Sequence, residues 1–180
     1  MTRVSVPSAA MLALQGRMKL NPVEVRQRVA ALRAAIERAK SGRARTEQWV
    51  FIRDVALISE SLMAAGVWRS TQDDRDAIVT PWLHVLIAAG ERAQRDDHSP
   101  LGEGDGGVLD GLMDWYQSLL TEASIQQLHW ARRSAAQLIH DGVEEERAAG
   151  NSVAGYSVSA ELARLVADII RERTRQGIAL

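Results

Sequence analysis

The stretch EQWVFIRDVALISESLMAA, at residues 47–65, is the most apolar long run with helical spacing in this 180-residue chain. Its apolar residues recur at steps of four, three, four and three, at Phe51, Val55, Ile58, Leu62 and Ala65. Further apolar residues flank this stripe on both sides, so a helix here has more apolar surface than one neighbour can cover. Thr46 stands at the N-cap position, and Gly66 stands at the left-handed position after the helix. We therefore expect this stretch to form the central helix of an all-α bundle.

A second helix with clear end signals precedes the central one. It opens at Asn21-Pro22, where Glu24 follows the cap by three residues and completes a capping box, and it ends before Gly42. Its apolar residues form a seam, at Val25, Val29, Leu32, Ile36 and Ala39. A seam with this spacing packs lengthwise against a neighbouring helix.

Four more helices are expected after the central one, which makes about six helices in a single irregular bundle without a sheet. The next helix begins at Ser70, with Asp73 three residues later as its partner in a start signal. Pro81 lies inside this helix and removes one backbone donor, which predicts a kink near that residue or a break into two helices.

Two glycine-rich stretches divide the second half of the chain. The first, at residues 96–107, is expected to be a loop, and the second, at residues 142–156, is expected to be a linker. Ser124 with Gln127 gives a further helix start between them. The remaining helices are expected at about residues 108–120, 124–140 and 159–175.

The chain is expected to form one domain, because 180 residues can bury a sizeable core without disulfides. We divide it into a basic N-terminal arm (1–20), a helical core (21–140), and a glycine-rich linker with a C-terminal helix (141–180) that packs on the same domain. The seam of the first helix and the isolated last helix both offer apolar faces, so a homodimer is expected. The chain has no cysteine and no apolar run of the ~20 residues that a membrane span needs, which predicts a soluble, cytoplasmic protein.

The charges are divided unevenly along the chain. Residues 1–45 hold ten of the 22 basic residues and two of the 23 acidic residues, a net charge of +8, whereas the remainder carries −9. The basic residues that we expect to form a partner-binding face are Arg26, Arg33, Lys40, Arg43 and Arg45. This face predicts binding to an acidic protein, or to nucleic acid through its phosphates. The third interpretation is that it pairs with the acidic part of the same chain, at residues 73–76 or 144–146.

One dipeptide, His140-Asp141, hints at an enzyme. It resembles the HD motif of metal-dependent phosphohydrolases, and that resemblance implies His98 and Asp168 as further metal ligands. The Gly-Val-Glu-Glu continuation departs from the pattern of that family, and a helix C-cap at residues 140–142 is the competing interpretation. We therefore expect no enzymatic activity, no bound metal and no cofactor.

Two of the five tryptophans stand where an interface residue could lie. Trp68 is beside a turn, and Trp130 lies between His129 and Ala131 on a helix. Tryptophan is enriched among the residues that dominate binding at protein interfaces. We expect both side chains to be candidate interface anchors.

Three segments, TEQWVFIRDVALI, VWRSTQDD and DWYQSLLTEASIQQLHWA, carry a resemblance to a known class of proteins. Over about residues 46–140 the chain resembles small helical proteins encoded by prophages and plasmids of proteobacteria. The resemblance implies an accessory protein of a mobile element that binds a host or phage protein. The expected function is a non-enzymatic interaction protein, for example an inhibitor of a host defence complex. A nucleic-acid-binding accessory protein and an HD-type phosphohydrolase are the alternatives.

Overall fold

The computed structural model describes residues 16–69, 71–94, 97 and 99–148. These residues form five helices, namely α2 (Pro22–Lys40), α3 (Thr46–Ala64), α4 (Gln72–Gln94), α5 (Glu103–Glu122) and α6 (Ile125–Ala148). The described part of the chain contains no strand, only one isolated bridge between Lys19 and Ser124, so the all-α prediction is confirmed. The number of helices differs from the expected six, because the helix expected at 159–175 lies outside the described residues.

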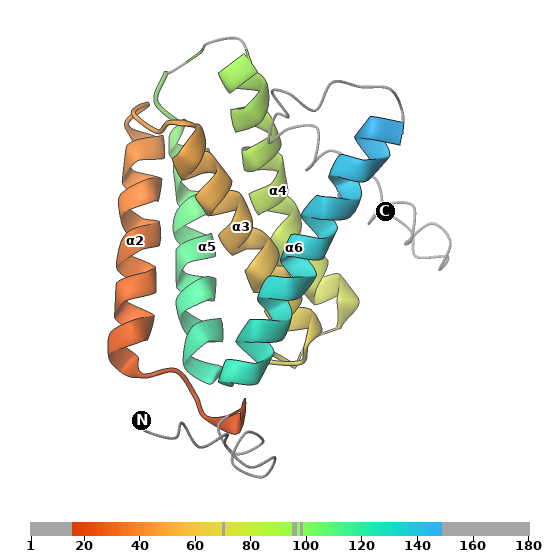
Figure 1. The fold of residues 1–180 in the computed structure, drawn as a ribbon. Helices are drawn as coiled ribbons and strands as arrows, with labels where there is room; N and C mark the ends of the chain where they lie inside the picture. The colour runs from red at the N-terminus through yellow and green to blue at the C-terminus, as the bar shows by residue number, and fades with distance from the viewer. Residues whose placement is uncertain (1–15, 70, 95–96, 98, 149–180) are drawn as a thin grey trace, which may run out of the picture.

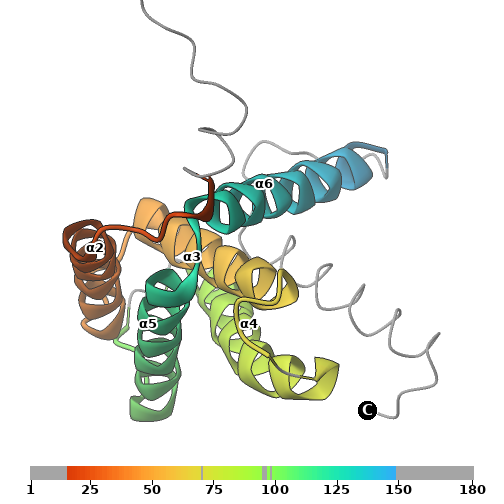
Figure 2. The same cartoon turned by 90° about the horizontal axis from the view of Figure 1, so that it is seen from below.

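Helix α3 is the centre of the bundle, as its sequence predicts. It packs against α2, α4, α5 and α6, and Figure 2 shows it in the middle with the other four helices around it. Ile52, Leu62 and Met63 are completely buried. The predicted stripe is wrong at Phe51, which remains 37% exposed because the buried face is turned toward its neighbour Ile52.

The ends of α2 and α3 follow the sequence signals closely. The Asn21 side chain accepts from the Val23 N–H at 2.9 Å, and the Asn21 N–H donates to Glu24 at 3.4 Å, which confirms the capping box. After each helix a glycine takes a left-handed conformation, with φ of 69° at Gly42 and 74° at Gly66. In this conformation the glycine and the residue after it donate backbone hydrogen bonds to carbonyls in the last turn of the helix, which closes the C-terminus.

Two helix starts are displaced by one residue from the predicted positions. Helix α4 begins at Gln72, and the Thr71 hydroxyl and N–H both donate to Asp74, so Thr71 and Asp74 form the capping pair. Ser70, the predicted start, lies outside the described residues. Helix α3 begins at Thr46 itself, with Arg45 as the N-cap. The Arg45 N–H donates to the Gln48 side chain at 2.9 Å. A capping residue and the residue three positions later can form the same hydrogen bonds at either of two adjacent positions in the sequence. The backbone geometry selects one of these positions.

Both glycine-rich boundaries are more helical than predicted. Helix α5 begins at Glu103, so residues 103–107 are not loop, and acidic side chains in its first turn favour the helix N-terminus. Helix α6 does start at the predicted Ser124–Gln127 box, but it continues through Gly142 to Ala148. The residues at 144–148 have high helix propensity, which outweighs the low helix propensity of Gly142. The linker predicted at 142–156 is therefore wrong up to residue 148, and the rest of it lies outside the described residues.

Helix α4 runs without interruption from Gln72 to Gln94 with Pro81 inside it. The predicted break into two helices is therefore wrong, and the kink near Pro81 stays a prediction. Pro81 is exposed, while Trp82 and Leu83 beside it are buried. Packing of the flanking residues thus holds the helix together across the missing backbone donor.

The last part of the N-terminal arm is attached to the bundle. The Ile125 N–H donates to the Met18 carbonyl at 2.8 Å, and Lys19 forms an ion pair with Glu122 at 2.7 Å. Residues 16–20 therefore lie against the junction of α5 and α6, near the lower end of the bundle in Figure 1. The remainder of the arm, residues 1–15, lies outside the described residues.

Candidate functional site

The turn between α2 and α3 gathers three arginines at one corner of the bundle. Gly42 reverses the chain, and the Arg43 N–H donates to the Arg38 carbonyl at 2.8 Å, which fixes the turn against the end of α2. Arg38, Arg43 and Arg45 then line a common hollow of about 400 Å³ together with Glu47 and Gln48. We call this the arginine hollow.

A second hollow adjoins the first and shares Arg43 and Arg45 with it. Its volume is about 470 Å³, and we call it the corner hollow. It is lined by Ala39, Gly42, Arg43, Ala44, Arg45, Thr46, Trp49, Ala89, Arg92, Asp97 and Ser99. It therefore lies where the α2–α3 turn meets α4 and the segment that follows α4.

The three corner arginines keep their charge available to an outside group. All three are exposed, and within the described part of the chain none of them forms an ion pair with a carboxylate. Arg43 donates from Nε to the Ser41 hydroxyl at 3.0 Å, a neutral partner that orients the guanidinium. Arg92 differs from them, because Asp97 lies 3.3 Å from its Nε and Ser99 also accepts from it.

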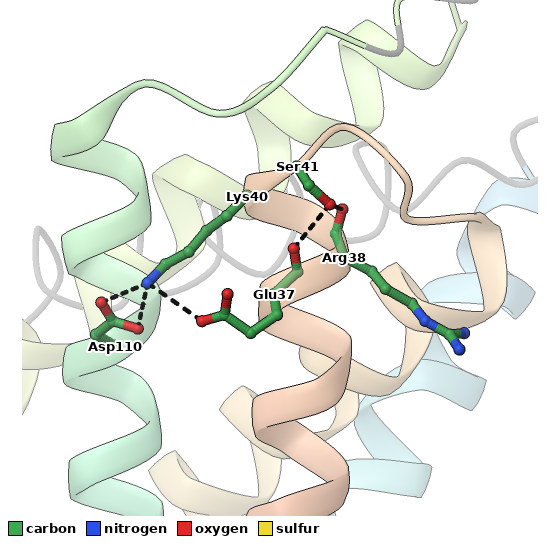
Figure 3. A network of polar contacts seen from close by, with 5 residues as sticks. All are labelled: Glu37, Arg38, Lys40, Ser41 and Asp110. Carbon is green, nitrogen blue, oxygen red and sulfur yellow. Dashed lines mark hydrogen bonds and ion pairs between the residues drawn. The ribbon is translucent and has the colours of Figure 1, made fainter.

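Lys40 belongs to the predicted basic face, yet it is engaged inside the molecule. Its Nζ lies 2.6 Å from both carboxylate oxygens of Asp110 on α5, and 3.8 Å from Glu37. Figure 3 shows Lys40 reaching toward α5, while Arg38 points away from this ion pair. The Lys40 side chain is only 29% exposed, so it is a structural contact between α2 and α5.

The other members of the predicted basic face take two different positions. Arg26 and Arg33 are exposed on α2, whereas Arg43 and Arg45 lie at the corner. Part of the basic charge is balanced within the chain by Asp110 and Glu122. Whether the acidic runs at residues 73–76 and 144–146 also pair with the basic face stays a prediction.

Sequence reasoning did not single out Arg38 or the apolar floor of the corner hollow. Arg38 could have been found from its place four residues before Gly42, because a chain reversal at that glycine brings the last turn of α2 beside residues 43–45. Ala89 on α4 carries no such signal, since only the packing of α4 brings it to the α2–α3 turn.

The two candidate interface tryptophans have different environments. The rings of Trp68 and Trp115 form an edge-to-face pair with centroids 4.6 Å apart and an interplanar angle of 61°. Trp68 is therefore part of the internal packing. Trp130 on α6 is 43% exposed, so its side chain is accessible to a partner and stays a candidate interface residue.

The α2 seam, one of the two faces on which the homodimer prediction rests, is covered within the chain, and the homodimer itself stays a prediction. Val25, Val29, Leu32, Ile36 and Ala39 are all buried within the chain. They face α3 and α5, the helices that pack on α2. The α2 seam is therefore not available to a second copy of the chain. The other apolar face on which the dimer prediction rests belongs to the expected last helix, which lies outside the described residues.

The predicted metal ligands do not come together in the described part of the chain. His140 is exposed, and the Asp141 carboxylate accepts from the Gln137 amide one turn earlier at 2.7 Å. His140 is not at a helix C-cap either, because α6 continues beyond it. His98 and Asp168 lie outside the described residues. Within those residues, no three His, Asp or Glu side chains form a group that could hold a metal ion.

Groups with a shifted pKa lie away from the corner. Burial raises the pKa of Glu60 on α3, against the lowering effects of Arg75 and of a hydrogen bond from Ser61. Hydrogen bonds from Thr71 lower the pKa of Asp74 at the start of α4.

Comparison with protein-family models, with curated proteins and with solved structures finds no match to this chain. The resemblance to proteins of mobile elements therefore stays a prediction. None of the five described helices has the length and apolar composition that crossing a bilayer requires. The corner of α2 and α3 is the site on which a functional proposal can be built.

Proposed function

We propose that this chain is a non-catalytic interaction protein that docks an acidic surface of a protein partner at its α2–α3 corner. The observation that supports this proposal best is the set of Arg38, Arg43 and Arg45 around one hollow, without a carboxylate partner among the described residues. Like charges held close together repel each other, and an anionic group from outside relieves that repulsion.

Arginine suits the recognition of carboxylates on a protein. Its planar guanidinium presents paired N–H donors that match the two oxygens of a carboxylate, and it keeps its charge at any physiological pH. The hydrogen bond from Arg43 to Ser41 leaves its other N–H groups available. A cluster of this kind also attracts an acidic partner over a distance, which raises the association rate at low salt.

The spacing of the cations favours a protein over a nucleic acid. A phosphate backbone is a continuous row of charges, and a binding surface follows it with several aligned cations. Arg26 and Arg33 are seven residues apart on α2, about 10 Å along the helix axis, and Lys40, the next in that row, is held by Asp110. Three arginines thus lie together at the corner, whereas Arg26 and Arg33 stand apart from them along α2. Nucleic-acid binding by the same arginines is the competing function.

The resemblance in residues 46–140 supplies the biological setting of the proposal. We propose an accessory protein of a mobile element that acts in the cytoplasm on a host or phage protein, for example as an inhibitor of a host defence complex. Inhibition of this kind needs shape and charge but no catalytic group. The exposed arginines at this corner, which form no ion pair with a carboxylate among the described residues, support such a role.

The test compares an acidic polypeptide with nucleic acids as probes. Labelled polyglutamate, duplex DNA, single-stranded DNA and RNA are titrated with the protein at low and at moderate salt, with fluorescence anisotropy as the readout. We expect polyglutamate to bind and the triple variant Arg38→Gln, Arg43→Gln, Arg45→Gln to weaken it about tenfold or more. The control variant Arg26→Gln, Arg33→Gln, Arg133→Gln removes the same charge elsewhere and should have a much smaller effect.

Two outcomes would overturn the proposal. If both triple variants weaken polyglutamate equally, binding depends on net charge and the corner has no special role. If DNA or RNA binds, polyglutamate does not, and the corner variant removes nucleic-acid binding, the competing function replaces the proposed one.

A further inference from the structure

We infer that the partner segment recognised at the corner is an acidic peptide that also carries one apolar side chain, which occupies the corner hollow while a neighbouring carboxylate occupies the arginine hollow. This inference rests on the proposed function and specifies the partner in more detail. It follows from the different chemistry of two hollows that share a wall.

The corner hollow has an apolar floor. Ala39 and Ala89 are buried at 2% and 4% exposure, and Ala44 and Trp49 are partly buried against the core. Three of these four side chains are alanine, so the small size of the residues creates the space at the junction of α2, α3 and α4. A floor of alanine and tryptophan favours an apolar group, because burying it removes apolar surface from water on both sides.

The charged residues around this hollow are not all alike. Arg92 forms an ion pair with Asp97 and also donates a hydrogen bond to Ser99, so it offers less attraction to an outside anion than an unpaired arginine does. Arg43 and Arg45 come from the α2–α3 turn instead, and they also line the arginine hollow with Arg38. Arg43 and Arg45 are therefore the arginines of the corner hollow that are available to a carboxylate.

The geometry sets the order of residues in the partner. Because the two hollows have Arg43 and Arg45 in common, a chain that fills both must place an apolar and an acidic side chain close together. Successive residues of an extended chain are about 3.3–3.6 Å apart. The carboxylates should therefore lie within one or two residues of the apolar side chain.

The apolar contact accounts for selectivity that charge alone does not provide. Exposed ion pairs contribute little and are screened by salt, so three arginines by themselves would bind many acidic segments weakly. An apolar side chain in a fitting hollow discriminates by about tenfold or more against a peptide that lacks it.

The experiment uses the full chain and four probes. These are the labelled peptide Asp-Glu-Asp-Leu-Asp-Glu, a peptide with Ser in place of Leu, a peptide with Asn and Gln in place of all acids, and oligothymidine. We expect the Leu peptide to bind about tenfold more tightly than the Ser peptide, and we expect the uncharged peptide to show no binding. The indole N–H resonance of Trp49, assigned with Trp49→Phe, should shift with the Leu peptide and much less with the Ser peptide.

Three variants locate the two contacts. Ala44→Leu fills the corner hollow, so it should lower the affinity for the Leu peptide to that for the Ser peptide. Arg43→Gln with Arg45→Gln should weaken both acidic peptides, and the matched control Arg26→Gln with Arg33→Gln should leave both nearly unchanged. Circular dichroism verifies the fold of each variant, and the comparison of Leu and Ser peptides on the unaltered protein decides the inference even where Ala44→Leu fails to fold.

The outcomes separate this inference from the proposed function. If the Leu and Ser peptides bind equally and both need Arg43 and Arg45, the apolar contact is wrong and the acidic partner stands. If neither acidic peptide binds, or if oligothymidine binds more tightly and depends on the same arginines, both the inference and the proposed function are refuted.

Discussion

Replacing Gly107 and Gly111 on α5 by alanine should stabilise the protein. Both glycines lie inside the helix, and a Cβ atom added at either one meets nothing within 4 Å. Glycine in a helix interior costs roughly 0.5–1 kcal/mol relative to alanine, because it loses more backbone freedom on folding. The double variant should therefore raise the free energy of unfolding by about 1–2 kcal/mol.

The matched control is Gly106→Ala in the same turn of the helix. A Cβ atom there would lie 3.3 Å from Cε and 3.5 Å from Cγ of Lys40. The Lys40 stem cannot move away without cost, because its Nζ is held by both oxygens of Asp110. We expect the gain in helix propensity to be reduced or reversed at this position.

Thermal and urea unfolding followed by circular dichroism measure both effects. In a domain of this size, 1 kcal/mol corresponds to about 2–4 °C in the melting temperature. If Gly107→Ala with Gly111→Ala lowers the melting temperature, then either this face of α5 is covered by another surface or the segment is not helical. If Gly106→Ala stabilises as much as the other two, the Lys40 stem is not a constraint.

Three further perturbations test the packing and the charges. In a double-mutant cycle followed by urea unfolding, Lys40→Met and Asp110→Asn should show a coupling energy of about 0.5–1 kcal/mol. Added salt should reduce this coupling, because the ion pair is partly exposed. An absent coupling would show that the ion pair is not formed in solution. Burial raises the pKa of Glu60, so its contribution to stability is present below the unfolded pKa and is lost as the pH rises through the folded pKa. Glu60→Gln should therefore raise the free energy of unfolding at neutral pH and much less in acid, whereas an equal effect at both would contradict the cause given. Trp68→Ala should lower stability by about 3 kcal/mol, since it removes the edge-to-face pair with Trp115, and should leave the affinity for acidic peptides unchanged; a loss of affinity without a loss of stability would instead make Trp68 an interface residue.

Local interactions are the part of this structure that the sequence determines by itself. The capping box at Asn21 and the left-handed turns at Gly42 and Gly66 depend on residues within one or two turns of each other. Such interactions form in the same way whatever surrounds the helix, so their residue spacing predicts them. The position of α3 at the centre also followed from its own apolar surface, which needed several neighbours to cover it.

Interactions between helices were decided only by the tertiary structure. Lys40 and Asp110 are 70 residues apart, and nothing in the spacing of either residue indicates the other. The start of α5 at Glu103 overrides a glycine-rich sequence, because packing against α2 stabilises helical turns that low propensity disfavours. The corner hollow needs the α2–α3 turn, α4 and the segment after α4 at one place, and its alanines become a binding floor only through that packing.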